Sequence, residues 1–109
     1  MFTSFFLKML NREAASPKHK SERIIESLQL QEGYTIADIG VGGGYFTFEF
    51  AKKVGKSGKV YAVDTQSKYL DFIRRQAERE GVDNIILVLA TEDGVDLPEA
   101  ALDLIFARN

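Results

Sequence analysis

The sequence has no cysteine and no tryptophan, a single histidine, and no excess of positive charge. The absence of cysteine excludes disulfide bonds and thiolate chemistry. With His19 as the lone imidazole, a zinc site would depend almost wholly on carboxylates, so we predict no metal site. The 14 Lys and Arg residues and 16 Asp and Glu residues give a formal charge of −2. Because nucleic-acid binders carry a basic surface, we expect no nucleic-acid partner.

Long hydrophobic runs are also missing. No apolar stretch approaches the roughly 20 residues that a membrane-spanning helix requires. Residues 1–10 are rich in apolar side chains, but they lack the basic start of a secretory signal, and Lys8 interrupts them. The spacing predicts a short amphipathic helix at 2–10, whose role as a packed flap, a ligand lid or a docking helix stays open. The sequence thus predicts a cytoplasmic protein with no membrane partner.

From residue 17 onward the pattern alternates between helical stripes and short apolar runs. It predicts helices at 17–30, 45–54 and 67–80, and strands at 35–39, 59–63, 84–90 and 102–107. Alternating strands and helices are typical of a parallel sheet with right-handed crossovers. The apolar strands indicate that both sheet faces are covered. The predicted fold class is therefore α/β, a Rossmann-like doubly wound parallel sheet of about four strands with N-terminal helices.

We expect a single domain with two parts. Residues 1–33 would form an N-terminal helical segment that packs on the sheet, and residues 34–109 would form the ligand-binding half-domain. The strand at 102–107 would lie at an exposed apolar edge, where native proteins usually have cover. We therefore predict a possible homodimer through the edge of this fourth strand.

The most informative segment is the glycine-rich turn at 40–44, which follows a strand and precedes a helix. Glycines there permit positive φ and let a ligand approach the backbone. The spacing is G-x-G-x-G, and Tyr45 occupies the sixth position, where a dinucleotide fingerprint requires glycine. This departure disfavours a NAD-dependent oxidoreductase, which we keep as a less favoured alternative.

Asp64 ends the second predicted strand, beside the glycine turn in a parallel sheet. A carboxylate at this place can accept hydrogen bonds from both hydroxyls of a ribose. The alternative is that Asp64 caps the helix that begins near Ser67.

The pattern Asp38-x-Gly40-x-Gly42-x-Gly44, then Asp64, then Leu102-Asp103-Leu104-Ile105-Phe106, resembles class I S-adenosylmethionine-dependent methyltransferases. Within this family, the pattern most resembles the branch of small-molecule C-methyltransferases and arsenite methyltransferases. The resemblance implies S-adenosylmethionine as the cofactor and a small-molecule methyl acceptor as the partner. It also implies cofactor contacts from the following residues: Asp38, Gly40, Gly42, Gly44, Asp64 and Thr65.

In this family an acidic residue after the third strand accepts a hydrogen bond from the adenine amino group. Here Glu92 or Asp93 would serve, although a solvated loop carboxylate is the alternative. Catalytic residues stay unknown, because methyl transfer depends mainly on alignment of donor and acceptor. Members of the family continue beyond a fourth strand, so the resemblance implies a cofactor-binding half, and whether this half is active alone stays open. A non-catalytic nucleoside-binding module or subunit is the alternative function.

Overall fold

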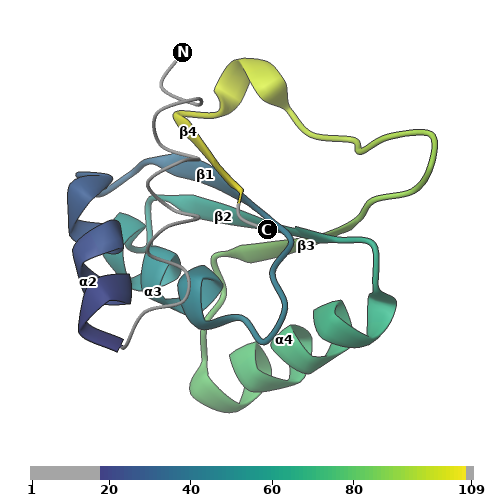
Figure 1. Cartoon of the computed structure of the whole chain (residues 1–109), viewed down its shortest axis with the longest axis horizontal. Coiled ribbons are helices and arrows are strands. Elements are labelled where there is room, and N and C mark those ends of the chain that lie inside the picture. Colours follow the sequence, from purple (N-terminus) through teal and green to yellow (C-terminus); the bar gives the residue numbers. More distant parts are fainter. Residues whose placement is uncertain (1–17, 108–109) are drawn as a thin grey trace.

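The computed structural model describes residues 18–107, and the helix expected at 2–10 lies outside them (Figure 1). The helices are α2 (Lys18–Ser27), α3 (Tyr45–Val54) and α4 (Ser67–Glu80), with a short 3₁₀ turn, η1 (Glu99–Ala101). The strands are β1 (Thr35–Ile39), β2 (Lys59–Asp64), β3 (Ile85–Leu89) and β4 (Leu104–Ala107). The elements expected in this part of the chain are thus confirmed in kind and order.

The four strands form one parallel sheet in the order β3-β2-β1-β4. Ala37 of β1 lies between Tyr61 of β2 and Ile105 of β4, which sets the register across the centre of the sheet. The chain therefore runs outward from β1 to β3 and then crosses back to the other side of β1. A ligand site is expected where such a sheet changes direction, beyond the carboxyl ends of its strands.

All three described helices pack on one face of this sheet. Side chains alternate between faces along a strand, so Ile36, Val60 and Phe106 point to one side. These three residues share a buried cluster with side chains of α2 and α3. Ala62, on the same side, packs with Ile73 of α4 in a second cluster. Right-handed crossovers through the order β1, β2, β3 place their helices on a single face, which explains the arrangement.

The other face carries no helix within residues 18–107, so the described residues do not test whether both faces are covered as expected. The segment from β3 to β4 crosses toward this face, yet it contains only the 3₁₀ turn η1 (Figure 1). Ala37 and Val63 are buried there, whereas Ile86 and Ile105 are 38% and 40% exposed. The parallel Rossmann-like fold is confirmed, and the cover on its second face is absent from the described residues.

Three phenylalanines hold the helix layer to the sheet near the end of β1. Phe46 and Phe50 of α3 contact Phe106 of β4, with ring centroids 4.9 Å apart in both pairs. Such pairs contribute about 0.5–1.5 kcal/mol beyond the area that they bury. The cluster fixes the start of α3, and therefore the glycine turn before it, against the strands.

The bounds of several elements differ from the expectation. Helix α2 ends at Ser27 rather than near residue 30, and Gln29 adopts φ +52°. Leu28 is nevertheless buried, and Leu30 packs against the same cluster. The apolar spacing predicted a longer helix because these side chains reach the core from a turn. No described helix is long and apolar enough to span a membrane.

Candidate functional site

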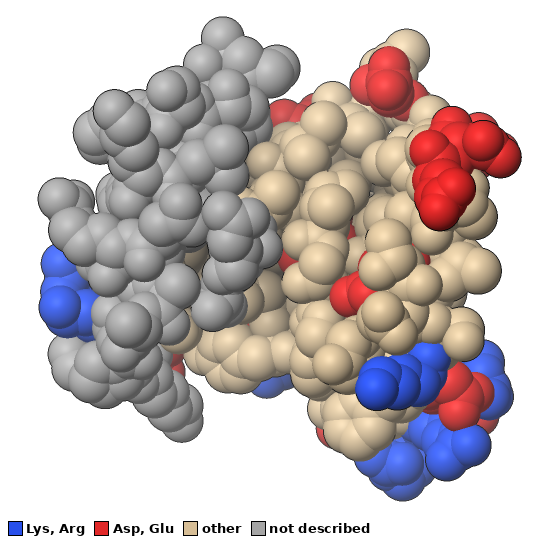
Figure 2. All heavy atoms as spheres, turned by 45° about the vertical axis from the view of Figure 1, so that its right-hand side comes forward, with Lys and Arg blue, Asp and Glu red and all other residues tan. Residues whose placement is uncertain are grey.

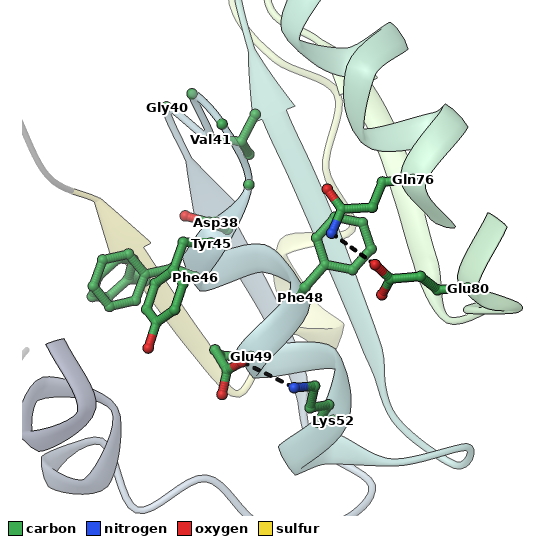
Figure 3. A pocket seen from close by; sticks show the side chains of 14 residues that line it. Asp38, Gly40, Val41, Tyr45, Phe46, Phe48, Glu49, Lys52, Gln76 and Glu80 are labelled. Carbon is green, nitrogen blue, oxygen red and sulfur yellow. Dashed lines mark hydrogen bonds and ion pairs between the residues drawn. The ribbon is translucent and has the colours of Figure 1, made fainter. Parts of the chain in front are cut away.

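A cavity of about 610 Å³ opens beside the glycine turn (Figure 3). Its wall includes Asp38 and Phe106 from neighbouring strands and the whole turn from Gly40 to Gly44. Tyr45 and Gln76 extend the wall along α3 and α4. The structure thus brings together four of the predicted site residues, namely Asp38, Gly40, Gly42 and Gly44.

The glycine turn depends on backbone conformations that favour glycine. Gly40, Gly42 and Gly44 have φ of +79°, +53° and +92°. A Cβ on Gly44 would lie 3.0 Å from the Cγ1 atom of Ile73, so helix α4 packs closely against this position. A Cβ on Gly42 or Gly43 would meet no atom within 4 Å. The outer side of the turn is therefore open for a ligand to lie on the backbone.

Asp38 is a buried acidic residue at the cavity wall, with 2% of its surface exposed. The hydroxyl of Thr47 donates a hydrogen bond to its Oδ2 atom, at a distance of 2.6 Å. Thr47 itself is fully buried in α3. Sequence reasoning missed Thr47, although an aliphatic hydroxyl in the aromatic run Tyr-Phe-Thr-Phe-Glu-Phe is a usable signal.

Asp64 lies at the carboxyl end of β2 and links the glycine turn to the next loop. Its Oδ2 atom accepts a hydrogen bond from Gly42 N–H at 3.3 Å, and its Oδ1 atom accepts one from Gln66 N–H at 2.9 Å. Gln66 is the N-cap of α4, and α4 has no side-chain cap hydrogen bond. Asp64 therefore orders the loop before the helix without capping its first turn. A carboxylate offers about four acceptor positions, so two remain for a ligand.

Asp64 and the remaining predicted contacts lie at the same edge of the sheet, and none of them is part of the cavity wall. Thr65 is exposed. Glu92 and Asp93 are exposed in a tight turn that pairs Thr91 with Gly94. The hydrogen bond from Ala90 N–H to the carbonyl oxygen of Asp64 holds the start of this turn beside β2. The choice between Glu92 and Asp93 as the adenine contact stays a prediction.

Tyr45 stands at the mouth of the cavity, with its ring edge against Phe46 (Figure 3). Partial burial, reinforced by the negative charges of Glu49 and Glu22, raises the pKa of the Tyr45 phenol above its ordinary value of 10.0. The phenol is therefore neutral at physiological pH. It can donate or accept a hydrogen bond there, but it does not serve as a phenolate base.

Figure 2 shows Lys and Arg side chains gathered with some Asp and Glu at the lower right of this face, and acidic side chains at its upper right. Basic and acidic side chains mix on α4, where Asp71 forms ion pairs with Arg74 and Arg75. The loop at 90–103 contains five acidic residues and no Lys or Arg. The β3–β4 loop is therefore acidic and the charges on α4 are mixed, and the absence of a nucleic-acid partner stays a prediction.

The glycine turn has an open outer side, the buried carboxylate of Asp38 at one end and the carboxylate of Asp64 beside it. This arrangement is typical of nucleoside-binding sites in Rossmann-like folds. The open space over Gly42 and Gly43 and the acceptor positions left on Asp64 fit an adenosyl group with a charged amino-acid end. A family model described as a methyltransferase domain matches residues 36–109. The chain therefore belongs to this methyltransferase family.

Individual relatives agree with this assignment. The chain is 36% identical to a probable cobalt-precorrin-6B C(15)-methyltransferase (decarboxylating) of Saccharolobus solfataricus, over 73% of this chain and 42% of the relative. It is 36% identical to a protein-L-isoaspartate O-methyltransferase of Methanococcoides burtonii, over 82% of this chain and 43% of the relative. A solved S-adenosylmethionine-dependent methyltransferase of Aquifex aeolicus superposes with a TM-score of 0.72 at 31% identity, covering 79% of this chain and 46% of that one.

These comparisons confirm the predicted family and its cofactor, S-adenosylmethionine. They do not confirm the small-molecule branch, because the names of these relatives include both a precorrin and a protein substrate. The chain spans less than half the length of each of these relatives.

Proposed function

We propose that this chain binds S-adenosylmethionine and forms the cofactor-binding part of a methyltransferase that acts on a small molecule. The observation that carries the proposal is the open glycine turn between two carboxylates, Asp38 and Asp64, beside a cavity of about 610 Å³. In the family pattern these two carboxylates serve the amino-acid end and the ribose of the cofactor.

The chemistry that the cofactor supplies is an activated methyl group on a sulfonium, which leaves readily in an in-line displacement. The residues of this chain would bind and orient the cofactor rather than activate it. Asp64 would accept hydrogen bonds from the ribose hydroxyls, and Asp38 would accept one from the ammonium group. Phe46 and Phe106 would exclude water from the inner cavity wall. Alignment of this kind can account for about 7–11 kcal/mol of a barrier.

Titration of the chain with S-adenosylhomocysteine in a calorimeter tests the cofactor assignment, with NAD as the control ligand. We expect S-adenosylhomocysteine to bind in the micromolar range and NAD to bind more weakly. Tighter binding of NAD would favour the oxidoreductase alternative instead. Absence of binding to either ligand, in a sample that circular dichroism shows to be folded, would refute the proposal.

Release of S-adenosylhomocysteine during turnover separates catalysis from binding alone. We propose a small-molecule acceptor because the sequence resembles that branch and because one relative carries a precorrin substrate in its name. Turnover with a tetrapyrrole precursor or another small acceptor would support this assignment. Turnover with an isoaspartyl peptide alone would contradict it, and binding without any turnover would favour a non-catalytic module. A cytoplasmic location remains part of the proposal.

A further inference from the structure

The hydroxyl of Thr47 is one of the few polar groups buried in the layer between the helices and the sheet. Thr47 and Asp38 are 0% and 2% exposed, and the 2.6 Å distance between Oγ1 and Oδ2 is short for a hydrogen bond. A short O–H···O⁻ contact is typical of a charge-assisted bond, which is stronger than one between neutral groups. The pair therefore joins α3 to β1 through a buried polar contact.

The two partners differ in their relation to the cavity. Asp38 lines it, next to Gly40 and Phe106, and Figure 3 labels Asp38 beside the glycine turn. Thr47 of α3 is buried and does not belong to the lining. The hydrogen bond to Asp38 is therefore the contact through which the Thr47 hydroxyl would act on a ligand.

A buried carboxylate needs donors in order to stay ionised away from water. Desolvation disfavours the charged form, and a hydrogen bond donated to the carboxylate favours it. The Thr47 hydroxyl also restricts rotation of the carboxylate about its Cβ–Cγ bond, since that rotation would break the contact. An ionised, oriented carboxylate is what a cationic ammonium group at the cavity wall requires.

We propose that Thr47 is a positioning residue for the amino-acid end of the cofactor, which it serves by holding the Asp38 carboxylate ionised and oriented. This inference rests on the proposed function, because it assumes that Asp38 receives the ammonium group of S-adenosylmethionine. The competing explanation is that Thr47 only stabilises the packing of α3 on β1.

Two ligands separate these explanations. S-adenosylhomocysteine carries the amino-acid end, whereas 5′-methylthioadenosine keeps the adenosine and the sulfur but lacks that end. Thr47→Val retains the size and β-branching of the side chain and removes the hydroxyl. We expect this variant to bind S-adenosylhomocysteine about ten-fold more weakly than the wild type and to bind 5′-methylthioadenosine equally well. Thr47→Ser keeps the hydroxyl and should restore the affinity for S-adenosylhomocysteine.

Calorimetric titration of the wild type and both variants measures these affinities, and urea unfolding measures their stability. Unchanged affinity of Thr47→Val for S-adenosylhomocysteine would overturn the inference. An equal loss for both ligands would also overturn it, since that result indicates general damage to the site. If Thr47→Val does not fold, Thr47→Ala replaces it, because alanine has a higher helix propensity and also lacks the hydroxyl.

Failure of the proposed function gives a different result. A folded wild-type chain that binds neither ligand would refute cofactor binding itself, before any variant is compared. A wild type that binds both ligands with equal affinity would show that the amino-acid end makes no net contribution, which overturns the role of Thr47 while leaving adenosine binding intact.

Discussion

Replacement of Asp64 by Asn should weaken S-adenosylhomocysteine binding by about 10- to 150-fold, because it removes the charge that the ribose hydroxyls would meet. Hydrogen bonds to a charged group contribute about 1.5–3 kcal/mol, and every 1.4 kcal/mol corresponds to about ten-fold in the dissociation constant. Asn is close in shape to Asp and retains one carbonyl oxygen. That oxygen can accept a hydrogen bond from either Gly42 N–H or Gln66 N–H, which both bond to the carboxylate in the wild type.

The same replacement should lower the free energy of unfolding by about 1–2 kcal/mol, since one backbone N–H then faces an amide NH₂ group. The lost hydrogen bond belongs either to the glycine turn or to the loop before α4, and most of the core remains intact. Urea unfolding measures this part, and calorimetric titration with S-adenosylhomocysteine measures the affinity.

Asp83→Asn is the matched control for charge. Asp83 is exposed between α4 and β3, at the end of the sheet away from the glycine turn. It should leave both affinity and stability unchanged. Wild-type affinity in a folded Asp64→Asn sample would refute the ribose assignment. An equal loss of affinity in Asp83→Asn would instead show that overall charge, rather than the position of Asp64, controls binding.

Three further predictions concern the turn, the core and the sheet edge. Gly42→Ala should lower the free energy of unfolding by about 1–2 kcal/mol because Gly42 has φ +53°. The control Gly43→Ala should leave it unchanged, and equal urea midpoints for the two variants would contradict this account. Phe50→Ala should lower the free energy of unfolding by about 3–5 kcal/mol, since Phe50 is fully buried against two aromatic rings. A loss below about 1 kcal/mol in urea unfolding would contradict the packing described. We expect the chain to dimerise through β4, because this strand has one strand neighbour among the described residues. Light scattering on dilution should show a dimer that Ile105→Lys disrupts, and a monomer at every concentration would refute pairing through this edge.

The order and type of the elements could be predicted from the sequence because each is a local pattern. Strand β1 and helices α3 and α4 have the predicted bounds, since apolar periodicity, the glycine turn and Gly81 delimit them. Strands β3 and β4 are shorter than predicted. Apolar residues at their ends, such as Leu102, continue the pattern beyond the pairing with neighbouring strands.

The division of the chain at residue 33 stays a prediction, because its first half falls largely outside the described residues. Helix α2 does pack against the same buried cluster as α3. The roles of Thr65, Glu92 and Asp93 also stay predictions, since exposed side chains in a loop make few contacts that would define them.

The sequence by itself determined the family, and it predicted the main anchors of the site. The glycine spacing, Asp38 and Asp64 predict a cofactor-binding turn because backbone conformation and carboxylate chemistry are properties of those residues and their local order. Only the tertiary structure decided that Thr47 donates to Asp38, because nine positions of chain must fold through the turn before the two atoms meet. It alone also showed that α2, α3 and α4 share one face of the sheet. The order of the strands and the handedness of their crossovers set that arrangement, and the pattern of a single strand predicts neither.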